Sequence, residues 1–157
     1  MKRLVAFVGV GVLSLAFMSS TCSMNSGQES QASSDQSLVA PTSGITFKKK
    51  SFEDAKAEAK KSGKLIFIDA YTDWCGPCKR MAATSFKDPK VGELFNKNFV
   101  NLKVEMEKDK DGPNLARKYG VKAYPTLLIV DGNGKLVKQS IGMKSSAQLI
   151  ALANSVL

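Results

Sequence analysis

The apolar residues from position 45 onward form two alternating patterns, continuous apolar runs and amphipathic stretches. Short runs rich in β-branched and aromatic side chains are typical of buried strands, whereas apolar residues that recur every three or four positions predict helices. By this criterion we expect strands at residues 45–47, 64–71, 99–106, 126–130 and 136–141.

The amphipathic stretches between these strands predict helices. The first has Ser51 as its expected N-cap and ends at Gly63. The others are expected after Cys75, after Asp88-Pro89, after a charged loop at residues 107–111, and from Ser145 or Ser146 onward. The last two strands flank the turn Asp131-Gly-Asn-Gly134 and form an antiparallel hairpin. This order predicts an α/β fold with a mixed central sheet, covered by helices on both faces, in one domain at residues 45–157.

The first 21 residues have the pattern of a signal peptide for export. Lys2 and Arg3 precede an apolar run at residues 4–18, which is short for a membrane span. A signal anchor or a core helix is the alternative. Cys22 follows at the point where bacterial lipoproteins carry their acylated cysteine, so it resembles a lipid-attachment site. Ordinary cleavage that leaves a free thiol is the alternative, because Ser19 and Thr21 differ from the residues usual before such a cysteine.

Residues 22–44 predict a flexible polar linker, because they are rich in Ser, Gln, Asn and Gly and contain few large apolar side chains. With an acylated Cys22 this linker would tether the domain to a membrane. The alternative is an unstructured spacer with no such role.

The chain is basic, with a formal charge of +9 that falls to +7 once Lys2 and Arg3 leave with the signal peptide. The lysines are interleaved with Asp and Glu, and no nucleic-acid-binding motif accompanies them. A solvated surface therefore explains them better than a nucleic-acid site, although the charge also suits an anionic membrane or an acidic partner. We expect no nucleic-acid partner, and we expect a monomer because no long apolar surface run is left over.

The motif that carries the chemistry is Trp74-Cys75-Gly76-Pro77-Cys78. It follows a predicted strand and opens a helix, with Gly76 and Pro77 in the first turn. Unpaired N–H groups and the positive end of the helix dipole stabilise a thiolate there, and cysteines in such motifs have pKa values of roughly 3.5–7.5 instead of about 8.5. Cys75 is therefore the predicted nucleophile. Cys78, one turn further in, is the predicted resolving thiol.

Two structural roles for this cysteine pair are less well supported. A disulfide across two residues closes a loop too small for much stabilisation. A zinc site needs four ligands, and the chain has three cysteines and no histidine. The absence of histidine also excludes Ser-His-Asp and Cys-His catalysis. We expect neither a metal nor a cofactor.

The order of elements, the W-C-G-P-C motif and Tyr124-Pro125-Thr126 before the hairpin together resemble the thioredoxin superfamily over residues 45–157. Residues 84–89 and the charged loop after Met106 are similar to those of exported thioredoxin-like proteins. They are also similar to the C-terminal domain of DsbD-type thiol:disulfide interchange proteins.

The resemblance assigns roles to further residues. Pro125 matches the cis-proline that faces the redox pair, with an ordinary trans-proline as the alternative. Asp69 matches a buried aspartate that serves as general base for Cys78, and burial should raise its pKa; the alternative is a purely structural carboxylate. Thioredoxins often place a lysine opposite that aspartate, and Asn101 aligns with it here. The other positions that match substrate contacts are Trp74, Gly76, Pro77, Tyr124, Thr126 and Gly142.

Two of these positions also have simple structural explanations. Trp74 could belong to the core, and Gly142 could be a turn glycine.

These observations predict an exported thiol:disulfide oxidoreductase of the bacterial periplasm or cell envelope, which reduces disulfides in protein substrates. Gly-Pro between the cysteines resembles the reducing members of the superfamily. A reductase outside the cytosol needs electrons from elsewhere, so an upstream membrane electron donor is expected. The alternatives are a disulfide oxidase or isomerase, and a non-catalytic thioredoxin-fold binding or assembly factor.

Overall fold

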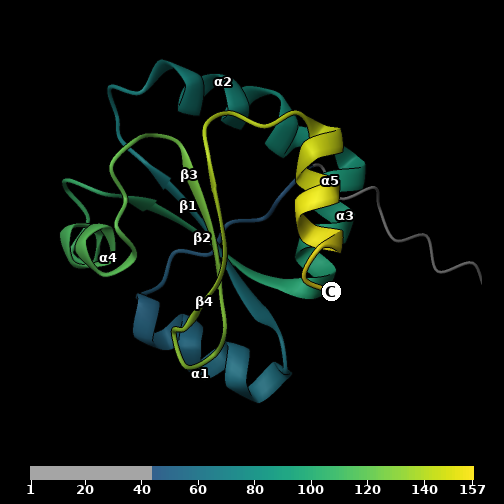
Figure 1. The fold of residues 1–157 in the computed structure, drawn as a ribbon. Helices are drawn as coiled ribbons and strands as arrows, with labels where there is room; N and C mark the ends of the chain where they lie inside the picture. Colours follow the sequence, from purple (N-terminus) through teal and green to yellow (C-terminus); the bar gives the residue numbers. More distant parts are fainter. Residues whose placement is uncertain (1–43) are drawn as a thin grey trace, which may run out of the picture. The chain divides into compact units, whose positions relative to one another are not determined.

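The computed structural model describes residues 44–157, which form a four-stranded sheet with helices on both faces (Figure 1). The predicted signal peptide, Cys22 and nearly all of the predicted linker lie outside the described residues. Within residues 44–157, no helix is both long and apolar enough to cross a membrane.

The sheet is mixed, as the sequence predicts. Its order is β2-β1-β3-β4, in which β1 runs parallel to β2 and antiparallel to β3, and β3 forms the predicted hairpin with β4. The strands are β1 (Leu65–Tyr71), β2 (Phe99–Glu105), β3 (Thr126–Val130) and β4 (Leu136–Ile141). The α-helices are α1 (Phe52–Ser62), α2 (Gly76–Ala83), α3 (Pro89–Asn98), α4 (Gly112–Tyr119) and α5 (Ser146–Asn154), and a short 3₁₀ helix, η1, spans Ser85–Lys87.

Capping residues determine where several helices begin and end. The Ser51 hydroxyl accepts the Asp54 N–H at 3.1 Å, and Gly63 ends α1 in the left-handed conformation with φ 68°. At α5, Ser145 and Gln148 form a capping box in which each side chain accepts the other residue's backbone N–H. These contacts confirm both predicted ends of α1 and the predicted start of α5.

Each face of the sheet buries its own apolar cluster. On one face, α1 and α4 pack against Ile66, Ile68, Val100 and Leu102. On the other, α2, η1, α3 and α5 pack against Phe67, Phe99, Leu127 and Ile129. Because side chains alternate along a strand, Asp69 lies on the same face as Phe67, under the layer that contains α2.

The strand predicted at residues 45–47 is wrong. These residues are extended, but their backbone bonds go to two different elements instead of forming a ladder. The Ile45 N–H donates to Phe86 O at 2.7 Å, and the Lys48 N–H donates to Asn101 O at 2.9 Å. Apolar alternation detects an extended, half-buried segment, but it does not show whether a neighbouring strand is available for pairing.

Candidate redox site

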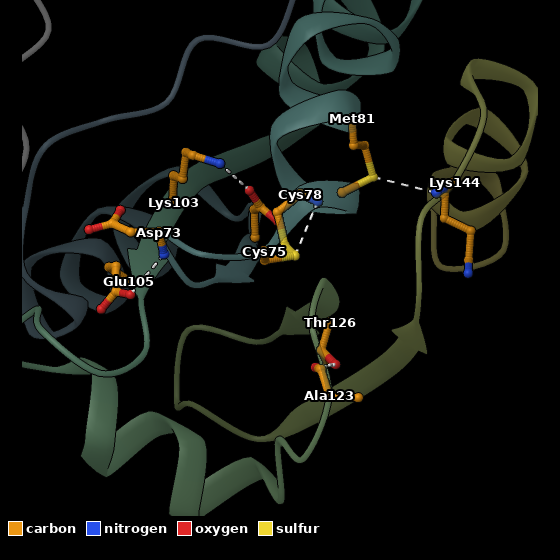
Figure 2. The surroundings of a disulfide bond; sticks show 10 residues. Asp73, Cys75, Cys78, Met81, Lys103, Glu105, Ala123, Thr126 and Lys144 are labelled. Atoms are coloured by element: carbon orange, nitrogen blue, oxygen red, sulfur yellow. Dashed lines mark hydrogen bonds and ion pairs between the residues drawn. A yellow bond between two sulfur atoms is a disulfide. The ribbon is translucent and has the colours of Figure 1, made fainter.

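A disulfide joins Cys75 and Cys78 at the start of α2, with their Cα atoms 5.3 Å apart (Figure 2). Cys75 is the N-cap of this helix, and Pro77 lies in its first turn, as predicted. The Cys78 N–H donates to Cys75 Sγ at 3.2 Å. Reduction of the disulfide would leave this N–H directed at the Cys75 sulfur, where it stabilises a thiolate.

The two cysteine residues differ little in exposure. Cys75 is 3% exposed and Cys78 is 1% exposed, so Cys78 is the deeper residue, as predicted, by a small margin. Because little of Cys75 is exposed, a partner must bring its disulfide into close contact with the surface around Cys75.

Trp74 lies at the surface beside the disulfide and not in the core. It is 67% exposed, and its ring contacts that of Tyr124 edge to face with centroids 5.8 Å apart. Its Nε1–H donates to Glu107 Oε2 at 3.1 Å. Two aromatic rings are thus available to a partner next to the redox pair.

The Tyr124–Pro125 peptide bond is cis, as expected from the resemblance, and the trans alternative is wrong. The Pro125 carbonyl accepts the Gly142 N–H at 2.8 Å, and Gly142 has a φ of 85°. The Thr126 hydroxyl, which is buried, donates to Ala123 O at 2.7 Å (Figure 2). The first bond joins the loop before β3 to the residue that follows β4, and the second holds the loop itself.

Asp69 is fully buried and forms an ion pair with Lys103, whose Nζ donates to Asp69 Oδ2 at 2.6 Å. Burial raises the pKa of the Asp69 carboxyl above its usual value, and the charge and hydrogen bond of Lys103 oppose that rise. The direction agrees with the sequence-based prediction. A raised pKa makes this carboxylate a better proton acceptor than an exposed one.

The lysine opposite Asp69 corrects the alignment that placed Asn101 there. In the sheet, Asp69 pairs with Lys103, whereas Asn101 pairs with Phe67 two residues earlier. In Figure 2 a dashed line marks the bond that the Lys103 ammonium donates to the Asp69 carboxylate. Residues 101 and 103 lie on the same face of β2, so the alternation that predicts the strand does not distinguish them.

Glu105 is a buried residue of the site that the sequence analysis missed. It is 3% exposed, and its carboxylate accepts the N–H groups of Asp73 at 3.1 Å, Glu107 at 2.8 Å, and Lys108. It therefore joins the loop before Cys75 to the loop after β2. Glu105 lies near the end of the predicted strand, just before the charged loop at residues 107–111, and nothing in that pattern distinguishes a buried carboxylate from solvated ones.

Among residues 44–157 no group of histidine, cysteine, aspartate and glutamate side chains has the composition of a metal site.

Comparisons with known proteins agree with this geometry. The family profile described as a thioredoxin-like domain matches residues 52–157. Thioredoxin from Acidithiobacillus ferridurans is 34% identical over 97 residues, which cover 62% of this chain and 83% of that relative. Chloroplastic thioredoxin F from Oryza sativa subsp. japonica is 37% identical over 81 residues, but the match spans only 40% of that relative's length.

Solved structures give the same result. A putative disulphide-isomerase from Bacteroides thetaiotaomicron is 42% identical, with a TM-score of 0.64, covering 73% of this chain and 97% of that one. The C-terminal domain of DsbD from Neisseria meningitidis has a TM-score of 0.56 at 23% identity, covering 66% of this chain and 90% of that one. This second likeness shows a shared fold.

Proposed function

Because the chain belongs to the thioredoxin-like family and carries a disulfide between Cys75 and Cys78, we propose that it is a thiol–disulfide oxidoreductase that reduces disulfides in protein partners. The observation that supports this most directly is the position of Cys75 as N-cap of α2, with the Cys78 N–H directed at its sulfur. That arrangement favours the thiolate, which is the nucleophile in disulfide exchange.

The proposed cycle begins with the dithiol form. The Cys75 thiolate attacks one sulfur of the partner's disulfide, which forms a mixed disulfide and releases the other sulfur as a thiolate. Cys78 passes its proton to Asp69 and attacks Cys75 Sγ. The Cys75–Cys78 disulfide forms, the second partner sulfur leaves as a thiolate, and two electrons have passed to the partner. An upstream dithiol donor, which we place at the membrane, then restores the starting state.

A protein partner would bind across the surface that surrounds the disulfide. Trp74 and Tyr124 offer aromatic faces there, and the loop with the cis peptide at Pro125, which is bonded to Gly142, borders the same surface. Gly76 and Pro77 leave the side of Cys75 without a large side chain, and Gly76 has open space where a Cβ would lie. Thr126 contributes by holding the loop, because its hydroxyl is buried.

The proposal predicts a covalent trap. A Cys78→Ala variant cannot resolve the mixed disulfide, so it should accumulate an adduct with a disulfide-containing protein such as insulin. Non-reducing gel electrophoresis and mass spectrometry measure the adduct. A Cys75→Ala/Cys78→Ala double variant is the matched control, and an adduct that persists in it would contradict the assignment of Cys75.

A second candidate function is disulfide isomerisation, because the Bacteroides thetaiotaomicron structure carries that description. The reduction potential separates the two. A reductase should have a potential near that of thioredoxins, about −270 mV, whereas an isomerase should lie near about −180 mV.

We also propose that the protein is exported and that Cys22 is acylated, which would hold the domain at a bacterial cell membrane through the linker. The supporting observation is the order of charged, apolar and cysteine-containing segments at residues 1–22. In a bacterial host fed radiolabelled palmitate, the full chain should become labelled and its Cys22→Ser variant should not. A wild-type chain that stays unlabelled would contradict the proposed acylation.

A further inference from the structure

The ammonium group of Lys103 lies among three aromatic rings as well as against Asp69. Its Nζ is 4.0 Å from the centroid of the Tyr71 ring, 5.8 Å from that of Phe86 and 5.9 Å from that of Phe47. All three distances are within the range at which a cation is attracted to the face of a ring. The rings come from three separate parts of the chain, namely β1, η1 and the extended segment before α1.

The segment that supplies Phe47 is held on several sides. Besides the two backbone bonds at Ile45 and Lys48, the Thr46 N–H donates to Asn96 Oδ1 at 2.8 Å. The Asn96 amide in turn donates to Gly44 O at 3.1 Å. This segment lies before residue 52, where the match to the family profile begins. Phe47 therefore lies outside the residues that the profile matches.

Phe47 is also held by its aromatic neighbours. Its ring contacts that of Phe86 edge to face at 5.2 Å and that of Phe67 at 6.3 Å. Phe67 and Phe86 contact each other at 6.2 Å. The position of the Phe47 ring is thus determined by the core cluster that also contains α2.

Water can reach the Lys103 ammonium and compete with its ion pair to Asp69, because the Lys103 side chain is 27% exposed. A cavity of about 590 Å³ adjoins it, lined by Phe47, Tyr71 and the lysines at 48–50 among other residues. A lysine stem is flexible and its ammonium is strongly hydrated, so water in this cavity competes with Asp69 for it. Rings that surround the ammonium reduce this competition.

We propose that Phe47, Tyr71 and Phe86 form an aromatic cage that positions Lys103 against Asp69. The cage extends the redox site to the segment that precedes the profile match, and its three members are positioning residues. The link to catalysis rests on the proposed function, in which Asp69 takes the proton of Cys78. The structural effect of the cage on the ion pair does not depend on that role.

The cage should be detectable in the titration of Asp69. Lys103 from β2 is the charged group that faces this carboxyl, while α2 presents the Cys75–Cys78 disulfide and β3 presents Leu127. Lys103 lowers the pKa of Asp69 against the effect of burial. A change that weakens the contact between Lys103 and Asp69 should therefore raise the pKa of Asp69.

The test is a ¹³C NMR titration of the Asp69 carboxyl in the oxidised protein, assigned with an Asp69→Asn variant. Tyr71→Leu and Phe47→Leu should each shift the midpoint upward by about 0.5–1 pH unit. Tyr71→Phe keeps the ring and should titrate like the wild type. Lys103→Met gives the shift for complete loss of the ammonium.

Phe52→Leu is the matched control, because the Phe52 ring also contacts lysines but lies on the opposite face of the sheet. In this variant the midpoint of the Asp69 titration should equal that of the wild type. Wild-type midpoints in both Phe47→Leu and Tyr71→Leu would overturn the cage, as would an unmoved midpoint in Lys103→Met. If Tyr71→Leu does not fold, Phe47→Leu decides the question. Activity of Asp69→Asn is measured separately, so failure of the proposed catalytic role remains distinguishable from failure of the cage.

Discussion

Cys75→Ser should lower the rate of insulin disulfide reduction by at least about a thousandfold, because it removes the nucleophile of the first exchange step and the sulfur that Cys78 attacks in the second. The substitution should leave the fold intact. A serine hydroxyl can accept the Cys78 N–H as the cysteine sulfur does, and serine is a favourable N-cap residue.

The rate is measured with a dithiol reductant in excess, and circular dichroism checks the fold. Cys22→Ser is the matched control, since it removes a cysteine outside the described domain and should retain the wild-type rate. A non-catalytic binding or assembly factor would lose nothing in Cys75→Ser. Retention of the wild-type rate would therefore refute the oxidoreductase assignment.

Asp69→Asn should raise the free energy of unfolding of the oxidised protein at pH 8.5 and have little effect on it at pH 3.5. Burial raises the folded-state pKa of Asp69 above its unfolded value. Such a group contributes its full stability below the unfolded pKa and loses it as the pH rises through the folded pKa. Asparagine cannot ionise and avoids this loss, and Lys103 is exposed enough to be solvated without its partner.

Urea unfolding at the two pH values measures the free energy of unfolding. Asp73→Asn serves as a control of opposite sign, because the hydrogen bond from Lys108 lowers the pKa of the exposed Asp73 carboxyl. The Asp73–Lys108 pair contributes stability that is lost as the pH falls, so Asp73→Asn should be destabilising at the higher pH. An equal effect of Asp69→Asn at both pH values would contradict the ionisation of Asp69 as the cause.

Much of the fold could be predicted because short stretches of sequence, such as helix caps and turns, determine where its elements begin and end. Ser51 and Gly63 fix the two ends of α1, and the turn at residues 131–134 fixes the hairpin. The motif at Cys75 is equally local, since the N-cap and both thiols lie within one turn of chain.

The parts that could not be predicted depend on contacts between distant segments. The charged partner of Asp69 is set by the register of β1 against β2, and Asn101 and Lys103 occupy equivalent faces of the same strand. The burial of Glu105 depends on the loop that folds over it. The pairing of residues 45–47 depends on η1, whose position the sequence does not specify.

The close packing at Gly44 determines where an expressed fragment of this domain should begin. A Cβ at Gly92 would lie 2.2 Å from the Gly44 carbonyl oxygen, so α3 and the segment before α1 are in direct backbone contact. A fragment trimmed to residues 52–157, the limits of the family profile, would lack the segment that packs against α3 at Gly92. Such a fragment would keep both cysteines and Asp69, yet it would not reproduce the surroundings in which the intact chain holds them.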